Sequence, residues 1–326
     1  MAEMVNGKWV DTAPTAEEVG KDGRFQRKDS TLRSVISPDP GAEFPAEAGR
    51  YHLWVAYVCP WASRTLAVRA IKGLEGVIAV HYAKPGLPKE GWTFAEGPAG
   101  EGREEGYPLH RLYAEHDPHY SGKVTVPVLR DSKTRRIVNN ESSEIIRILN
   151  SAFDGITGSR LDLYPEDLRP QIDHWNDIIY PGLNNGVYRA GFAKTQAAYD
   201  EAVREVFATL DRMEAHLATH RYLAGEWCTE ADWRAFTTLV RFDVAYHYAF
   251  KCNLRRVQDY PALSNYLREL YQWPGIVPSV NLEEIKFGYW FLADKHRIVA
   301  IGPKIDLTAP HDRDRLPGRG VRERTA

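Results

Sequence analysis

The residues best suited to chemistry in this chain lie in the stretch 59–62, whose sequence is CPWA. A strand-like run, residues 51–57, precedes it, and a helix-like run, residues 63–74, follows it. Cys59 is therefore expected on the first turn of a helix, where unpaired backbone N–H groups and the positive end of the helix dipole favour a thiolate. Pro60 suits the first helical position, because its missing N–H has no partner there in any helix.

The stretch is a Cys-x-x-Cys redox motif whose second cysteine is replaced by Ala62. A mixed disulfide on Cys59 then has no local thiol to resolve it, so an external thiol must do so. A cysteine has a pKa of about 8.5 in water, and the helix start must lower it to give a useful fraction of thiolate. The motif therefore predicts thiol-transfer chemistry with a small soluble thiol.

A second feature is the pair Val126-Pro127 in a strand-like run downstream of the cysteine. The X-Pro bond is either cis, as in tight bends beside sites, or trans on an edge strand. The neighbouring Cys59 favours the cis form, although the sequence does not decide between them. A cis proline would leave the N–H and C=O groups of Val126 available to the backbone amides of a peptide thiol.

A third feature is the pair Glu141-Ser142 at an expected helix start. Ser142 and the open N–H groups suit a carboxylate, and Glu141 suits an ammonium group. A γ-glutamyl group carries both of these charges on one carbon. The alternative is that Asn140 or Ser142 simply caps the helix, which is the commoner use of such residues.

The elements that must position these residues follow from hydrophobic periodicity. The pattern predicts strand, helix and strand over residues 51–82, then a hairpin and a helix over residues 124–149. This β-α-β then β-β-α order is typical of a thioredoxin-like fold. Further helices are expected over residues 233–250, 261–271 and 281–290, the first of them opened by a capping box of Thr229 and Asp232.

The chain accordingly divides into an α/β part and an all-α part. Residues 1–50 form a polar N-terminal extension, and residues 51–158 form the thioredoxin-like, thiol-binding domain. A Gly- and Pro-rich surface insertion without regular periodicity is expected at about residues 83–122. Residues 159–311 form a larger all-helical domain, and the Arg- and Asp-rich tail, residues 312–326, is expected to be disordered.

The composition argues against several classes of function and location. Of the 326 residues, 43% are hydrophobic and 26% are charged, with 42 Lys and Arg against 44 Asp and Glu. This balance predicts no affinity for nucleic acid or for a membrane surface, and the polar N-terminus indicates no secretory signal. Three cysteines are too few for a disulfide framework, so a reducing cytoplasm is the expected location. The histidines near residue 116 lack partners, and no metal site or bound cofactor is expected.

These features together resemble a known family. The first half is similar to the thioredoxin-like half of glutathione transferases, and the whole from about residue 23 to residue 312 is more similar still to the Xi class, the glutathionyl-hydroquinone reductases. The matching segments are residues 59–62, 91–92, 124–129 and 138–145 in the first half and residues 186–192, 241–243, 250–254 and 285–289 in the second.

The resemblance implies a role for each of several residues. Cys59 would be the nucleophile, and Tyr188 and Tyr289 would line the quinol pocket and donate hydrogen bonds to the ring oxygens. The thiol cosubstrate would be held by five residues: Trp92, Lys123, Val126, Glu141 and Ser142. The resemblance also implies a homodimer.

The chain departs from the family's pattern at several positions, including a Ser-His pair that is absent from residues 291–293. Ser63 stands where the family usually has His, Trp290 where it often has a second Tyr, and Lys123 where Arg is expected. A lysine cannot bind a carboxylate through two parallel hydrogen bonds as an arginine can. The cosubstrate is therefore left open between glutathione and another small thiol such as mycothiol.

The sequence thus predicts an enzyme, an oxidoreductase of the glutathione transferase type. It would remove glutathione or a similar thiol from thioether-conjugated hydroquinones through a mixed disulfide on Cys59. Two alternatives remain. One is an Omega-like thiol transferase or dehydroascorbate reductase, and the other is a non-catalytic ligand-binding protein of the same fold.

Overall fold

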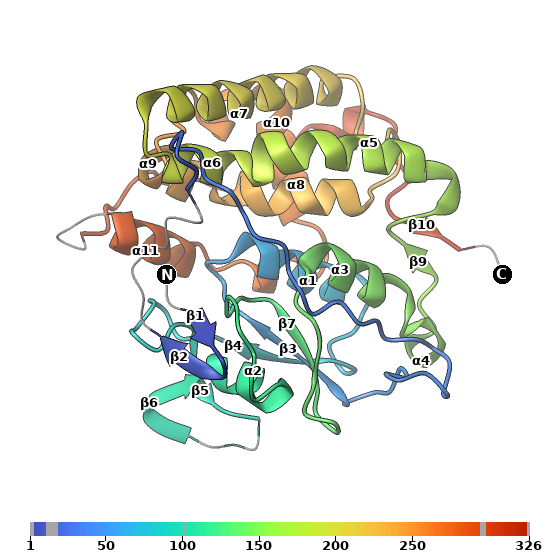
Figure 1. Cartoon of the computed structure of the whole chain (residues 1–326). Coiled ribbons are helices and arrows are strands. Elements are labelled where there is room, and N and C mark those ends of the chain that lie inside the picture. The colour runs from blue at the N-terminus through green and yellow to red at the C-terminus, as the bar shows by residue number, and fades with distance from the viewer. Residues whose placement is uncertain (1–2, 11–18, 99, 101, 294–297, 325–326) are drawn as a thin grey trace. The chain divides into compact units, whose positions relative to one another are not determined.

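The structure is a computed structural model of the chain, and it describes residues 3–10, 19–98, 100, 102–293 and 298–324 (Figure 1). The chain divides into two units. The thioredoxin-like unit comprises Met1–Glu18 and Lys28–Ser159, and the helical unit comprises Val19–Arg27 and Arg160–Ala326. The division after Ser159 lies one residue from the boundary expected from the sequence.

The elements of the thioredoxin-like unit are as follows: β1 (Glu3–Val5), β2 (Lys8–Val10), β3 (Tyr51–Val55), α1 (Pro60–Ile71), β4 (Ala79–Tyr82), β5 (Thr93–Glu96), β6 (Gly102–Pro108), α2 (His110–His116), β7 (Val128–Asp131), β8 (Ile137–Asn139), α3 (Ser142–Ser151) and α4 (Asp154–Thr157). The elements of the helical unit are β9 (Leu161–Asp162), α5 (Arg169–Ile179), α6 (Gly186–Phe192), α7 (Gln196–Leu217), α8 (Glu230–Arg241), α9 (His247–Ala249), α10 (Pro261–Tyr271), α11 (Leu282–Ala293) and β10 (Arg322–Glu323), with short 3-10 or π-helical turns between several of them.

A four-stranded sheet of order β4-β3-β7-β8 forms the centre of the thioredoxin-like unit. β4 runs parallel to β3, whereas β7 is antiparallel to both β3 and β8. The parallel pair needs a crossover connection, which α1 supplies. Helices α1 and α3 lie on one side of the sheet and α2 on the other (Figure 1). Because both faces are covered, Leu53, Trp54 and Val55 of β3 are fully buried. The predicted thioredoxin-like order is confirmed.

The segment 83–122 is more regular than expected. It contains an antiparallel pair, β5 and β6, followed by α2, whose Leu112 and Tyr113 are buried. The expectation of irregular chain is therefore wrong here. The pairing of β5 with β6 shifts register between Phe94 and Glu96, and α2 has only 7 residues. These elements are therefore too short or too irregular to give a hydrophobic period that can be recognised in the sequence.

The helical unit confirms the predicted capping box. The backbone N–H of Thr229 donates to the Asp232 carboxylate at 2.7 Å at the start of α8. The helix expected over residues 233–250 is interrupted, however, because a π-helical turn, Phe242–Tyr246, separates α8 from α9. A π-turn inserts one extra residue into the helical repeat, and it shifts every later side chain around the axis.

Part of the N-terminal extension belongs to the helical unit. Residues Val19–Arg27 contact α6 and the start of α7, where the Phe25 ring packs 5.2 Å from the Phe192 ring and the Lys194 N–H donates to the Gly23 carbonyl at 3.0 Å. Gly23 has a φ of +83°, and a Cβ there would lie 2.7 Å from the Thr195 side chain. Only glycine fits this close approach without strain.

The C-terminal segment corrects another expectation. Residues 312–326 were expected to be disordered, but the described part, as far as Arg324, is bound to the helical unit. Arg313 is fully buried and donates to the carbonyls of Leu217 at 2.7 Å and of His220 and Arg221 at 2.6 Å. The Leu217 carbonyl ends α7, where a helix has no internal donors left, and the other two carbonyls follow within four residues. One buried arginine in a polar tail gives no apolar pattern, so the sequence did not reveal it.

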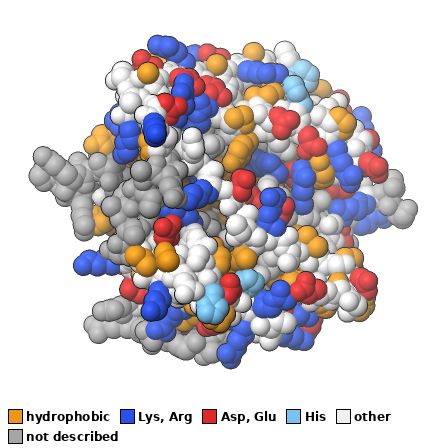
Figure 2. Space-filling view, viewed as in Figure 1, with side chains coloured by type: hydrophobic (Ala, Val, Ile, Leu, Met, Phe, Trp, Pro, Cys, Tyr) orange, Lys and Arg blue, Asp and Glu red, His pale blue; other side chains and the backbone are white. Residues whose placement is uncertain are grey.

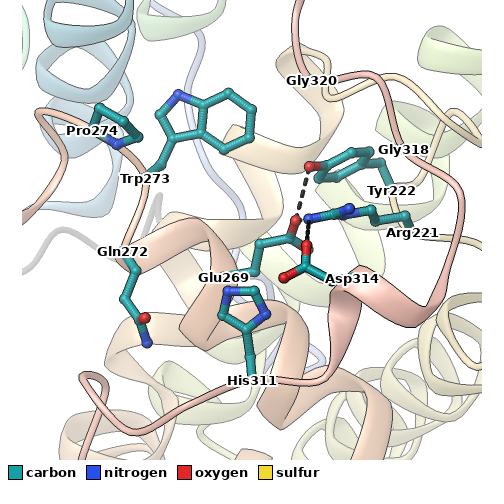
Figure 3. A pocket seen from close by; sticks show the side chains of 10 residues that line it. All are labelled: Arg221, Tyr222, Glu269, Gln272, Trp273, Pro274, His311, Asp314, Gly318 and Gly320. Carbon is teal, nitrogen blue, oxygen red and sulfur yellow. Dashed lines mark hydrogen bonds and ion pairs between the residues drawn. The ribbon is translucent and has the colours of Figure 1, made fainter.

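The same segment lines a cavity of about 350 Å³ in the helical unit (Figure 3). Glu269 accepts hydrogen bonds there from the Tyr222 hydroxyl at 2.9 Å and from Arg221 Nε at 2.7 Å. Arg221 also reaches Asp314 of the C-terminal segment at 2.6 Å. Arg221 therefore links Glu269 of α10 to the C-terminal segment through two ion pairs.

The surface shows no separation of charge on the face in view. Lys and Arg side chains are interspersed with Asp and Glu (Figure 2), in keeping with a formal net charge of −2. Within the described residues, no helix combines the length and the apolar character that a membrane span requires.

Replacing Arg313 tests the anchoring of the C-terminal segment. We expect Arg313→Met to lower the free energy of unfolding by about 3–5 kcal/mol, because the carbonyls of Leu217, His220 and Arg221 lose a charged donor. The control is Arg315→Met, whose side chain is 48% exposed and whose bonds to the Ala218 carbonyl are 3.5 Å long. It should change the value by less than about 0.5 kcal/mol. Urea denaturation followed by circular dichroism measures both, and equal midpoints would contradict the anchoring.

Candidate active site

Cys59 occupies the N-cap position of α1, as the sequence predicted. Its backbone is extended, with φ −82° and ψ 117°, and Pro60 takes the first helical position. The Cys59 side chain is half-buried, and its Sγ lies 3.5 Å from the carbonyl oxygen of Val126. The structure therefore brings two of the predicted site residues together, the cysteine and the backbone before the proline.

The other cysteines differ sharply from Cys59. All three are thiols, but Cys228 and Cys252 are fully buried in the helical unit. Burial raises the pKa of Cys252 to about 12 and that of Cys228 well above its usual range. A thiol in that state is a poor nucleophile at neutral pH. Cys59 is therefore the one cysteine whose surroundings suit reaction with a dissolved molecule.

The Val126-Pro127 bond is cis, which decides the question that the sequence left open. β7 begins only at Val128, after the proline, because proline has no N–H to donate to a ladder. The preceding residue, Thr125, is held through its backbone by the Tyr113 hydroxyl, which donates to its carbonyl at 3.0 Å and accepts from its N–H at 3.3 Å. The backbone at Val126 is thus fixed beside Cys59.

Glu141 and Ser142 open α3, although the capping residue is not the one expected. Glu141 is the N-cap, and its carboxylate accepts hydrogen bonds from the Ser143 N–H at 3.0 Å and the Ser143 hydroxyl at 2.9 Å. Capping by Asn140 or Ser142 is therefore wrong. Ser142 stands at the first helical position, where its Oγ accepts a long bond of 3.5 Å from Arg64 Nη1.

Arg64 links α1 to α3 and was not predicted from the sequence. It lies one helical turn beyond Pro60, is buried, and places its guanidinium 4.5 Å from the centre of the Trp61 ring. Its contact with Ser142 connects the cysteine's helix to the start of α3. A basic residue five positions after the cysteine was the only available signal, and it is too weak to assign a role.

Lys123 and Trp92 are placed by other contacts. Lys123 Nζ lies 3.9 Å from the Glu3 carboxylate of β1. Trp92 immediately precedes β5, and its carbonyl accepts from the Leu109 N–H at 2.8 Å. Their roles toward a thiol remain predictions from the resemblance.

Two predicted site residues of the helical unit meet directly. The hydroxyls of Tyr188 and Tyr289 lie 2.6 Å apart, and the Tyr246 hydroxyl lies 3.2 Å from that of Tyr289. Burial raises the pKa of both Tyr246 and Tyr289 well above the usual range, and the nearby positive charge of Arg241 opposes this only in part. These phenols therefore stay protonated at neutral pH and can donate hydrogen bonds.

Tyr246 is the member of this cluster that sequence reasoning missed. It ends the π-helical turn after α8, and its ring packs against those of Phe250 and Tyr289 at 5.3 and 5.1 Å. A regular helix over residues 233–250 would turn this side chain in a different direction. Because a π-turn has no sequence signature of its own, the position could not be singled out.

The departures from the family's pattern have structural partners. Trp290 donates from Nε1 to the Val244 carbonyl of the π-turn at 2.8 Å and stacks on Tyr248 at 4.0 Å. Ser63 is buried, and its N–H donates to the Cys59 carbonyl at 3.1 Å in the first turn of α1. Trp290 therefore supports the π-turn that carries Tyr246, whereas the Ser63 bond is an ordinary backbone bond of the helix.

No metal centre accompanies these groups in the part of the chain that the structure describes. Within it, no three or more His, Cys, Asp and Glu side chains gather in a way that could hold an ion. The chemistry available from the described residues is that of a thiol beside a fixed backbone and of buried phenol donors. A thioredoxin-like unit with this cysteine, followed by a helical unit, is typical of cysteine-dependent thiol transferases.

Comparison with known proteins defines the family. Residues 58–152 match the family model of the glutathione S-transferase N-terminal domain, and residues 196–269 match that of the C-terminal domain. Glutathionyl-hydroquinone reductase YqjG from Escherichia coli (strain K12) is 46% identical over 327 residues, which span 96% of this chain and 99% of that protein. Glutathionyl-hydroquinone reductase PcpF from Sphingobium chlorophenolicum is 46% identical over 89% of this chain and 91% of its own length.

Solved structures agree. A Xi-class glutathione transferase from Natrialba magadii superposes with a TM-score of 0.87 at 43% identity, covering 98% of both chains. The glutathione-bound structure of Escherichia coli K-12 YqjG superposes with a TM-score of 0.81 at 47% identity over 87% of this chain and 96% of that chain. The chain therefore belongs to the glutathione S-transferase family and, within it, to the Xi class. The resemblance predicted from the sequence is confirmed.

Alkylation of the native protein tests the contrast between the cysteines. We expect iodoacetamide at neutral pH to label Cys59 and to leave Cys228 and Cys252 unlabelled, because their thiols are buried and protonated. Peptide mass spectrometry locates the label. Cys59→Ser should abolish labelling of the folded protein, whereas unfolding in urea should expose the remaining thiols. Labelling of Cys228 or Cys252 ahead of Cys59 would overturn the assignment.

Proposed function

We propose that this protein is a glutathione-dependent reductase that removes glutathione from thioether-conjugated hydroquinones. The observation that carries the proposal is the half-buried Cys59 at the start of α1, with Ala62 where a resolving cysteine would stand. Two relatives that are each 46% identical carry the name glutathionyl-hydroquinone reductase, which gives the thiol chemistry a substrate class.

The reaction proceeds in two steps, each a displacement at sulfur by a thiolate. The Cys59 thiolate attacks the sulfur of the conjugate, and the bond from that sulfur to the hydroquinone ring breaks. The ring carbon keeps the electron pair and takes up a proton, so the hydroquinone is released and a Cys59–glutathione disulfide remains. A second glutathione thiolate attacks this disulfide, releases glutathione disulfide and restores the Cys59 thiolate. The ring carbon is reduced, and two glutathione sulfurs are oxidised.

The thioredoxin-like unit would hold the glutathionyl group. The Val126 backbone beside Cys59 would pair with the peptide amides of glutathione, as an added strand does. The Ser142 hydroxyl and backbone N–H, at the positive end of α3, would bind the γ-glutamyl carboxylate, and Glu141 would bind its ammonium group. Trp92 and Lys123 would complete this surface, with Lys123 acting as a single positive charge.

The helical unit would supply the hydrogen-bond donors for the quinol. Tyr188 and Tyr289, whose hydroxyls share a hydrogen bond in the structure, would exchange it for hydrogen bonds to the ring oxygens, which gain negative charge as the carbon–sulfur bond breaks. A phenol with a raised pKa keeps its proton, so the cluster can donate throughout the reaction. Tyr246, through its 3.2 Å contact with the Tyr289 hydroxyl, would orient that donor.

We further propose glutathione rather than mycothiol as the physiological thiol, because a relative with 47% identity has been solved with glutathione bound.

The protein would act on small molecules in the cytoplasm as a homodimer, without binding nucleic acid or membranes. Light scattering of the purified protein tests the dimer, and a monomer at micromolar concentration would contradict it.

Replacing Cys59 tests the covalent step. We expect Cys59→Ser to lower kcat/KM for a glutathionyl-menadiol conjugate by about 10³-fold or more, because the nucleophile is lost. Cys252→Ala, which alters a buried thiol, should keep wild-type activity. Mass spectrometry of wild-type protein treated with the conjugate should show one glutathionyl group on Cys59. Full activity of Cys59→Ser would exclude the mechanism. An adduct formed only with mycothiol would identify mycothiol, in place of glutathione, as the thiol that the protein uses.

Removing one phenol tests the donors. We expect Tyr289→Phe to lower kcat by about tenfold to a hundredfold, since one donor to the developing charge is lost while two phenols remain. Tyr199→Phe is the matched control, because the Tyr199 hydroxyl donates to the Lys251 carbonyl at 2.7 Å, outside the cluster. Steady-state kinetics with the same conjugate separate the two variants. Equal kcat values for them would remove Tyr289 from the mechanism.

A further inference from the structure

Tyr113 is a fully buried residue of α2 whose hydroxyl joins two separate segments. It donates to the Thr125 carbonyl at 3.0 Å and accepts from the Thr125 N–H at 3.3 Å. It also accepts from Asn140 Nδ2 at 3.2 Å. A hydroxyl has one proton and two lone pairs, so these three bonds use its whole capacity.

The two segments are the ones that frame the proposed glutathione site. Thr125 directly precedes Val126, whose carbonyl lies 3.5 Å from the Cys59 sulfur. Asn140 directly precedes Glu141, the N-cap of α3. The Asn140 backbone N–H and side-chain oxygen are engaged by Leu32, at 2.9 Å and 3.3 Å, so Asn140 is held from both sides. The hydroxyl therefore sets the spacing between the Val126 backbone and the start of α3.

We propose that Tyr113 is a positioning residue that fixes this spacing to the length of a γ-glutamyl peptide thiol. The inference rests on the proposed function, since it assumes that the cysteinyl amide meets Val126 and that the γ-glutamyl charges meet the start of α3. A rigid spacing lowers the loss of freedom on binding, so it adds affinity without touching the reacting sulfur. Tyr113 itself contacts neither Cys59 nor, in this arrangement, the thiol.

Several features support a positioning role over a purely packing one. The ring is already buried by its neighbours, including Tyr120 at 4.9 Å, so packing alone does not require the hydroxyl. Burial raises the pKa of Tyr113, so the group remains a neutral phenol that can donate and accept at once. A hydroxyl buried in such surroundings is costly unless it is satisfied, which ties the positions of its partners together.

The test compares two tyrosines that each lose one hydroxyl. We expect Tyr113→Phe to weaken glutathione binding about three- to tenfold, from the usual contribution of such hydrogen bonds, and to raise KM for glutathione by the same factor. The kcat value should stay within about twofold of wild type, and iodoacetamide should label Cys59 at the wild-type rate, because the sulfur is not altered. Calorimetry under reducing conditions gives the dissociation constant.

Tyr51→Phe is the matched control. Tyr51 is also fully buried, and its hydroxyl donates to the Pro45 carbonyl at 2.7 Å, away from Val126 and α3. Both variants should lose a few degrees of thermal stability, but Tyr51→Phe should bind glutathione as wild type does. If Tyr113→Phe does not fold, Asn140→Ala removes the link from Tyr113 to the start of α3, together with the bond from the Leu32 N–H, and should weaken glutathione binding in the same way.

The outcomes separate this inference from the proposed function. Wild-type affinity of folded Tyr113→Phe or Asn140→Ala for glutathione would overturn the positioning role while leaving the reductase proposal intact. An equal loss of affinity in Tyr51→Phe would also overturn it, because general destabilisation would then explain the effect. A wild-type protein that neither binds glutathione nor reduces the conjugate would overturn both.

Discussion

The structure depends on one constraint, that the Cys59 sulfur must lie at the start of a helix and beside a fixed backbone. Pro60 begins α1 and leaves Cys59 extended, with its sulfur 3.5 Å from the Val126 carbonyl. β7 begins only after Pro127, and the carbonyl of Val126 lies outside this strand, beside the cysteine. The sheet and α3 hold that backbone in place. The rest of the unit can be understood as the scaffold for this contact.

Burial raises the pKa of both cysteine and tyrosine side chains, but the consequences for their function are opposite. Cys228 and Cys252 lose their reactivity when buried, because their thiols hold their protons more tightly. The buried tyrosines Tyr246 and Tyr289 also hold their protons more tightly, but a phenol is useful as a donor only while it has its proton. A raised pKa therefore makes the two buried thiols unreactive, but it suits the buried phenols to their proposed role as hydrogen-bond donors. Partial exposure distinguishes Cys59 from both.

How much the sequence predicts depends on whether the signal is local. The position of Cys59, the start of α1 and the bounds of α10 follow from a proline, a cysteine and a strong period, and all agree with the structure. The segment 83–122 and the C-terminal tail were misjudged, because short elements and a single buried Arg313 give no period. Tyr246 was missed because a π-turn changes direction without changing composition. Tyr113 was missed because its partners are distant in sequence.

The assignment of Val19–Arg27 to the helical unit has a consequence for how the chain must be made. The Asp22 carbonyl accepts from the Thr195 hydroxyl across 173 positions of sequence. Residues 19–27 are therefore synthesised before the strands of the central sheet, whereas their partners in α6 and at the start of α7 are synthesised after it. A fragment that begins at residue 160 would leave the Phe192 ring without Phe25, so a fragment that keeps this contact must also carry residues 19–27.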